Sequence, residues 1–89
     1  MTKGSVNKML SDHAHALARI AAGLAPGQSA RVRDTLRRWG CYTMESTGVR
    51  EYTIHLTDEG RRLLEAYEEK FGRVRAGEER TFAPAVVTF

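Results

Sequence analysis

Two short runs of alternating apolar and polar residues, 41–46 and 51–56, constrain the fold of this chain more than any other feature of its sequence. The alternate positions with the larger apolar side chains are Tyr42, Met44, Tyr52, Ile54 and Leu56. A period of two is typical of a β-strand with one buried face and one solvent-facing face. Thr47-Gly48 separates the runs and indicates a tight turn, so the two strands are predicted to form an antiparallel hairpin.

Helical patterns precede this hairpin. Between residues 6 and 24, apolar residues recur in steps of three and four, at Val6, Met9, Leu10, Leu17, Ile20, Ala21 and Leu24. That spacing predicts one helix or two, ended by Pro26-Gly27. The next helix is expected to begin at Ser29, a favourable N-cap, and to end at Gly40, since glycine commonly follows a helix. Its apolar edge consists of Val32, Leu36 and Trp39.

A further helix is predicted after the hairpin. Thr57 is a favourable N-cap, and Asp58 and Glu59 suit the positive end of a helix dipole. The expected buried stripe of this helix is Leu63, Leu64, Tyr67, Phe71 and Val74. The helix should end after Gly72 or Ala76, because the pattern breaks there. The complete order is helix, helix, hairpin, helix, which predicts an α+β and mostly helical fold.

The chain of 89 residues is long enough for one domain. We assign residues 1–76 to that domain and residues 77–89 to a C-terminal tail. The tail is apolar from residue 81 to residue 89, whereas most chain ends are polar. Several placements remain open: docking on the chain's own core, addition of a strand to a sheet edge, packing on a partner subunit, and disorder.

Positive charge is concentrated around the hairpin. The net charge is +3, and arginine supplies eleven of the fourteen basic residues. Between residues 31 and 50, five arginines stand against only two carboxylates. With Val32 and Leu36 facing inward, the helical period places Arg33, Asp34 and Arg37 toward solvent, with Arg31 and Arg38 on the flank. Arginine suits phosphates and guanine edges, although a genome rich in arginine codons is an equally good explanation of the arginine content alone.

Two segments resemble winged helix-turn-helix proteins, in particular the MarR-like and PadR-like regulators. "RVRDTLRRWGCYTM" is similar to a recognition helix followed by the first wing strand, and "REYTIHLTDEGRRLLEAYEE" is similar to the second wing strand and the next helix. The family pattern at that place is matched by Leu56, Thr57, Asp58, Gly60, Arg61, Leu63 and Leu64. The resemblance covers roughly residues 16–71. The turn before Ser29 is longer than in a standard helix-turn-helix, and the short N-terminal part leaves no room for a MarR-type ligand pocket.

The resemblance implies a transcriptional regulator that binds double-stranded DNA sequence-specifically, acts by occupancy and works as a homodimer. The recognition helix would enter the major groove, and the hairpin would lie along the neighbouring minor groove or backbone. The residues implied for base or groove contact are Gln28, Ser29, Arg31 and Arg33. Those implied for phosphates are Arg37, Arg38 and Arg50, with Arg61 and Arg62 as weaker candidates.

Another class of function remains open, a winged-helix protein-interaction module such as a small inhibitor of host machinery encoded by a mobile element. The apolar tail favours that alternative. An enzyme is not expected, because no phosphate-binding glycine loop, nucleophile elbow or dinucleotide fingerprint occurs. We expect no metal or other cofactor, because His13 and His15 would point to opposite sides of a helix. Lacking a signal sequence and a long apolar run, the chain is expected to be cytoplasmic, with no membrane partner.

Overall fold

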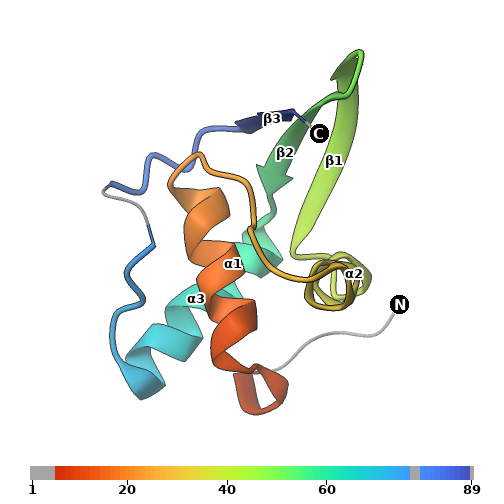
Figure 1. The fold of residues 1–89 in the computed structure, drawn as a ribbon. Helices are drawn as coiled ribbons and strands as arrows, with labels where there is room; N and C mark the ends of the chain where they lie inside the picture. Colours follow the sequence, from red (N-terminus) through yellow and green to blue (C-terminus); the bar gives the residue numbers. More distant parts are fainter. Residues whose placement is uncertain (1–5, 77–78, 89) are drawn as a thin grey trace.

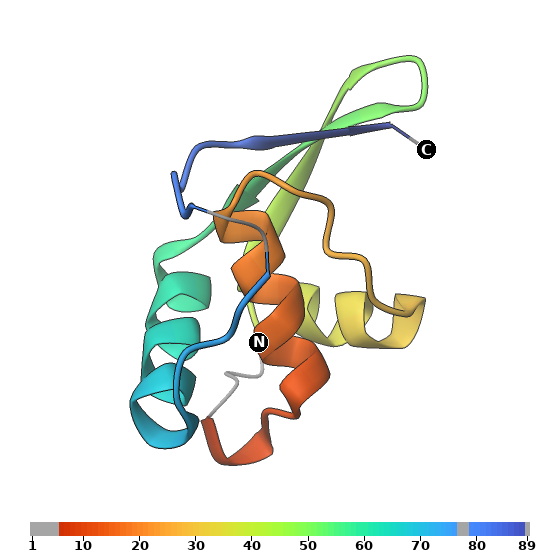
Figure 2. The same ribbon diagram turned by 60° about the vertical axis from the view of Figure 1, so that its left-hand side comes forward.

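A computed structural model describes residues 6–76 and 79–88 of the chain. Its elements in order are the 3-10 turn η1 (Val6–Lys8), α1 (Ser11–Ala21), α2 (Ala30–Arg38), β1 (Tyr42–Gly48), β2 (Glu51–Leu56), α3 (Asp58–Phe71) and β3 (Ala85–Thr88). The described residues thus form three α-helices and one three-stranded antiparallel sheet, which confirms the α+β class. The helices lie on one side of the sheet, and the β1–β2 hairpin extends beyond them (Figures 1 and 2).

Helix α1 occupies the centre of the molecule, between α3 and α2 (Figure 1). Its small and aliphatic residues are almost completely buried: Ala14, Ala16, Leu17, Ala18, Ile20 and Ala21. Alanine allows neighbouring backbones to approach closely, so one short helix can contact both other α-helices and strand β2. The predicted apolar stripe between residues 6 and 24 is interrupted at Leu10, whose side chain is 63% exposed. Leu10 has an extended backbone at the N-cap of α1, which separates η1 from α1.

The hairpin has the alternation that the sequence predicts. Tyr42 lies opposite Leu56, Met44 opposite Ile54, and Ser46 opposite Tyr52. These residues share the face toward the helices, because residues paired across antiparallel strands lie on the same face. The turn differs from the prediction, however. It consists of Val49-Arg50 rather than Thr47-Gly48, because β1 continues through Gly48 after a pairing irregularity, and Arg50 adopts a left-handed conformation with φ 57°.

Strand β3 adds a third strand where the sequence predicted only two. It pairs antiparallel with β2 of the same chain, with Ala85 opposite Ile54 and Val87 opposite Tyr52. Ala85 and Val87 are buried, while Val86 between them is 61% exposed. The tail therefore docks on a sheet edge of its own chain. Packing of the tail on a partner subunit stays a prediction.

Helix α3 buries Leu63 and Leu64 against α1, as predicted. The predicted stripe is wrong at Phe71, which is 59% exposed. Phe71 is the last residue of the helix, beyond the end of the core. Its ring packs against that of Tyr67, at 4.7 Å between centroids, and Lys70 Nζ lies 5.3 Å from its centroid. The chain after α3 is held back against the helix by an ion pair between Arg80 and Glu68.

One junction joins four of these elements. Gly40, with φ 72°, ends α2, and Cys41 leads into β1. The backbone N–H of Thr57 donates to the carbonyl of Cys41 at 3.0 Å, and its hydroxyl donates to the carbonyl of Gly40. The same hydroxyl caps α3 by accepting the N–H of Gly60 at 3.1 Å. Threonine at position 57 thereby ties the end of α2 and the start of β1 to the start of α3.

Gly60 is required at this junction for space. A Cβ atom at residue 60 would lie 2.1 Å from the carbonyl oxygen of Cys41 and 2.8 Å from Leu56 Cδ1. Helix propensity alone favours alanine over glycine by up to about 1 kcal/mol. We expect the steric effect to win, so that Gly60→Ala lowers the free energy of unfolding by about 2–3 kcal/mol. Urea denaturation followed by Trp39 fluorescence measures this change. A neutral or stabilising result would show that the junction relaxes without cost.

Candidate nucleic-acid interface

Helix α2 and the hairpin lie on the same side of α1, with the hairpin tip projecting past the helices (Figure 2). Ser29 starts α2 by accepting the N–H of Val32 at 3.4 Å, as the sequence predicts. Leu36 is fully buried and Val32 and Trp39 are partly buried against the core. This orientation leaves Arg31, Arg37 and Arg38 exposed on the outer surface of the helix.

The outer surface of α2 is open to solvent and basic. Arg31, Asp34, Arg37 and Arg38 line an open depression of about 880 Å³. Within residues 6–76 and 79–88, no carboxylate lies within ion-pair distance of any of the three arginines. Arg38 donates only to the hydroxyl of Thr35, at 3.3 Å. Three guanidinium groups near one another repel, and a bound anion would relieve that repulsion.

Three arginines of α3 and the segment after it are paired with carboxylates, whereas Arg73 and Arg75 are exposed without a carboxylate partner among the described residues. Arg61 contacts Glu65 at 3.1 Å, Arg62 pairs with Glu59, and Arg80 pairs with Glu68. Arg61 also lies over the ring of Phe82, at 4.1 Å from its centroid. Arg61 and Arg62, the weaker phosphate candidates from the sequence, therefore already have intramolecular partners.

Arg50 supplies a further cation at the hairpin tip. It is exposed beside Val49, which is 93% exposed, and no carboxylate among the described residues pairs with it. A cation at the end of a projecting hairpin can reach a surface that the helical body does not touch. Arg31, Arg37 and Arg38 thus share the outer surface of α2, and Arg50 lies at the turn of the hairpin beside that helix.

The remaining candidates from the sequence have intramolecular roles. Arg33 was expected to face solvent, and this expectation is wrong: Arg33 is half-buried between α2 and the sheet, and its Nε is buried without an acceptor among the described residues. The helix is rotated so that the carbonyl of Arg33 accepts a hydrogen bond from the Tyr42 hydroxyl at 3.2 Å. Gln28 is half-buried with its amide nitrogen 3.4 Å from His15 Nδ1. The Ser29 hydroxyl oxygen is used in the helix cap.

Three residues that the sequence did not indicate as a site lie beside Arg37. Met44, Ser46 and Tyr52 on the inner face of the hairpin line a cleft together with this arginine. The alternation of the strands did predict that Met44 and Tyr52 face inward. It gave no sign that the helices leave this part of the sheet uncovered, because that depends on where α2 lies relative to the hairpin.

Two other chemistries are poorly supported by the described residues. Cys41 is buried, and burial with the nearby Glu59 raises the pKa of its thiol to about 12. The thiol is therefore protonated at neutral pH and unsuited to nucleophilic attack. Within the described ranges, no group of three or more His, Cys, Asp or Glu side chains could hold a metal ion.

Comparison with known proteins supplies no relative, because no protein-family model, curated protein or solved structure matches the chain. Over the described part of the chain, no helix combines the length and apolar character needed to span a membrane.

His13 of α1 contacts Trp39 at the end of α2, and its pKa is lowered in the folded protein. Its ring lies 5.1 Å from that of Trp39, and its Nδ1 accepts the N–H of Leu10 at 2.9 Å. Burial lowers the pKa of His13 below 6.5, although Asp12 acts in the opposite direction. The folded protein therefore holds this histidine neutral under conditions in which the unfolded chain binds a proton.

This difference predicts a pH-dependent stability. Above about pH 6.5 both states carry a neutral His13, and below it the unfolded chain takes up a proton first, so the free energy of unfolding should fall as the pH decreases. We expect His13→Gln to reduce the fall measured by urea denaturation between about pH 7.5 and 5.5. His55→Gln is the matched control, since the His55 side chain is 43% exposed on the sheet. Equal slopes in both variants would contradict the assignment to His13.

Proposed function

We propose that the chain is a winged helix-turn-helix protein that binds double-stranded DNA, with α2 as the recognition helix and the β1–β2 hairpin as the wing. The order α1, α2, hairpin, α3 supports this proposal, as does the position of α2 beside the hairpin. The observation that carries it is the contrast among the arginines. Arg31, Arg37, Arg38 and Arg50, on α2 and the hairpin, have no carboxylate partner among the described residues, whereas Arg61, Arg62 and Arg80 do. Arg73 and Arg75 after α3 are also unpaired, but they lie outside α2 and the hairpin.

The dimensions of α2 suit a major groove. An α-helix with its side chains is about 10–12 Å across, and the major groove of B-DNA is about 12 Å wide. The nine residues of α2 give it a length of about 14 Å at 1.5 Å per residue. Arg31 lies in the first turn, where a recognition helix reaches base edges. Arg37 and Arg38 lie in the last turn and would contact phosphates, as would Arg50 from the hairpin tip. In this assignment Gln28, Ser29 and Arg33 position the interface and do not contact bases.

The protein would act by occupying DNA as a homodimer, without chemistry of its own. Two copies related by a two-fold axis would double the phosphate contacts and select an approximately palindromic site. Regulation of transcription would follow from blocking or recruiting other proteins at that site.

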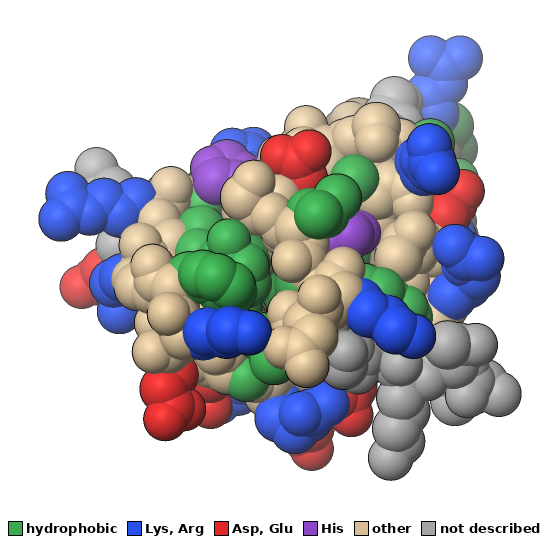
Figure 3. Space-filling model, turned by 90° about the horizontal axis from the view of Figure 1, so that it is seen from below, with side chains coloured by type: hydrophobic (Ala, Val, Ile, Leu, Met, Phe, Trp, Pro, Cys, Tyr) green, Lys and Arg blue, Asp and Glu red, His purple; other side chains and the backbone are tan. Residues whose placement is uncertain are grey.

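A protein-interaction module is the second candidate, and one cleft favours it. Between the start of α1 and α2 lies a cavity of about 450 Å³ with Leu10, Val32 and Trp39 in its lining and Lys8 and Arg31 beside them. The underside of the molecule shows hydrophobic side chains between Lys and Arg side chains (Figure 3). Such a surface would accept an apolar side chain of an acidic partner, such as a component of host machinery.

Salt dependence separates these two functions. We expect binding to a fluorescent 20-base-pair duplex to weaken steeply between about 50 and 200 mM salt, because bound cations release counterions from DNA. Arg38→Ala and Arg50→Ala should each make the slope of log K against log salt shallower by about 0.9. Fluorescence anisotropy measures both effects.

Arg61→Ala is the control for this experiment. It removes the same charge from an exposed arginine that is paired with Glu65, and its slope should match that of the parent. If all three variants change binding equally, or if the parent binds DNA weakly and without salt dependence, the DNA-binding proposal fails and the protein-interaction module gains support.

The homodimer predicts a stoichiometry. A palindromic duplex selected from a random pool should bind two copies of the chain, because the two-fold axis of the protein would coincide with that of the DNA. Analytical ultracentrifugation of the complex gives this ratio directly. One copy per duplex, with no dimer in the absence of DNA, would contradict the homodimer.

A further inference from the structure

Strand β3 forms one of the two edges of the sheet. The strand order is β1-β2-β3, so β2 has a hydrogen-bonded neighbour on both sides, whereas β3 has one only on the side of β2 (Figure 1). Within residues 6–76 and 79–88, no backbone hydrogen bond joins 85–88 to any segment other than β2. The N–H and C=O groups on the outer side of β3 are therefore available to a further strand.

This edge lacks the features that usually prevent edge-to-edge pairing, which are charged side chains, proline and bulges. No residue of Ala85–Thr88 carries a charge, Pro84 precedes the strand, and the register with β2 is regular. Val86 is 61% exposed on the outer face of the sheet, while Ala85 and Val87 are buried on the face toward the helices. The strand thus presents an uncharged backbone edge with an exposed valine beside it.

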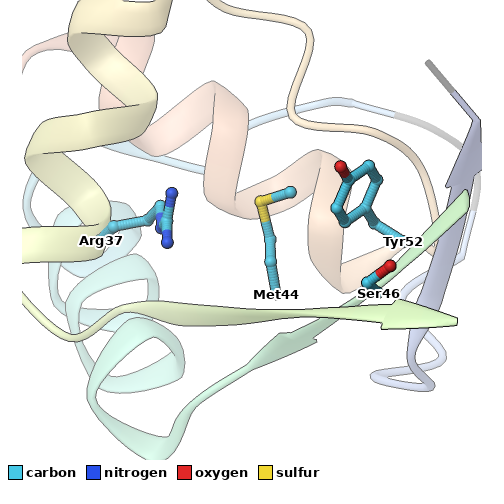
Figure 4. A pocket seen from close by; sticks show the side chains of 4 residues that line it. All are labelled: Arg37, Met44, Ser46 and Tyr52. Carbon is cyan, nitrogen blue, oxygen red and sulfur yellow. The ribbon is translucent and has the colours of Figure 1, made fainter. Parts of the chain in front are cut away.

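The opposite edge, β1, is protected. Glu45 is exposed there, and the pairing of β1 with β2 shifts between Ser46 and Gly48. Helix α2 also lies against β1, and Figure 4 shows Arg37 of this helix extending toward Met44 of β1. A partner strand added to β1 would stand beside the proposed recognition helix, whereas one added to β3 leaves α2 and β1 uncovered.

A second copy of this chain fits the β3 edge by symmetry. Two identical strands pair antiparallel about a two-fold axis perpendicular to the sheet, and each copy then supplies the same surface. Residues directly opposite one another in an antiparallel pair lie on the same face, so the axis has to pass between two copies of the same residue. With Val86 opposite Val86, Ala85 lies opposite Val87, and the exposed and buried sets of both copies coincide.

We propose that the β3 edge binds the β3 edge of a second copy, with Val86 opposite Val86, so that two three-stranded sheets join into one of six strands. The inference rests on the proposed function for its purpose, because the homodimer assigned to DNA needs an interface that leaves α2 free. The two β1 strands are then about 24 Å apart, at about 4.8 Å between neighbouring strands, and one α2 lies against each of them. This separation is of the same order as the distance of about 34 Å between half-sites one turn of DNA apart.

Sedimentation equilibrium of the full chain without DNA tests the association. A strand of four residues gives a small interface, so we expect a dissociation constant of about 10–100 µM and mostly dimer at about 0.5 mM. A parent protein that stays monomeric at that concentration overturns the proposal.

Matched variants locate the interface. Val86→Lys and Thr43→Lys each place a charge at an exposed position of the outer face, but at opposite edges of the sheet. Only Val86→Lys brings two like charges opposite one another across the axis, so we expect it to weaken dimerisation about tenfold or more and Thr43→Lys to change it less than about twofold. Far-UV circular dichroism checks that both variants fold. Dimerisation of Val86→Lys at the strength of the parent, or equal weakening by both variants, overturns the β3 edge as the interface.

A cross-link tests the register. Opposite residues of an antiparallel pair have Cα atoms about 4.5–5.5 Å apart, which a disulfide can bridge. Val86→Cys should therefore form a disulfide-linked dimer under mild oxidation at least about tenfold faster than Thr43→Cys. The native Cys41 is buried, so the parent should not cross-link. Equally fast cross-linking of the two variants, or none in either, contradicts the register.

The two proposals fail separately. A dimer that depends on Val86 but binds no DNA would refute the proposed function and leave the β3 interface intact. Salt-dependent DNA binding by a chain that is monomeric at about 0.5 mM would do the reverse.

Discussion

The contact between Thr57 and the Gly40–Cys41 segment determines how the rest of the molecule is arranged. Thr57 donates to both carbonyls of that segment and accepts the N–H of Gly60, so one side chain joins the end of α2 to the beginning of α3. The Cys41 carbonyl fits against Gly60 because no Cβ intervenes. The base of the hairpin is therefore clamped from both of its ends, and the angle between α2 and the hairpin depends on this clamp.

The chemistry of the candidate interface depends on that angle. Rotation of α2 about its axis decides which arginines face outward, and the packing of Leu36 and the hydrogen bond from Tyr42 to the Arg33 carbonyl fix this rotation. Arg37 and Arg38 differ by one position, yet only Arg37 faces the hairpin and lines its cleft. Charge on the surface and the shape of the cleft are thus two results of the same packing.

Local signals in the sequence predicted the helices and the hairpin well, but they predicted the contacts between these elements less well. Ser29, Gly40 and Thr57 mark helix ends through hydrogen bonds with near neighbours, and such bonds depend on only a few consecutive residues. Arg33 was assigned to solvent because helical periodicity describes α2 alone and omits the sheet that covers part of it. The third strand was left as one of several placements of the tail because its pairing partner, β2, lies about thirty residues earlier in the chain. Of the candidate site, the clustering of arginines and the shortage of carboxylates near them were visible in the sequence, but the position of Arg37 beside Met44, Ser46 and Tyr52 was not.

Strand β3 gives the hairpin an unusual dependence on the order of synthesis. It pairs with β2 between Glu51 and Ile54, the half of that strand nearer the tip, and it follows every other helix and strand of the described residues. During translation the hairpin and the three helices leave the ribosome first, and β2 then has an open edge. The nascent chain completes its sheet only when β3 emerges, so the nascent hairpin is exposed to pairing with other chains until that moment.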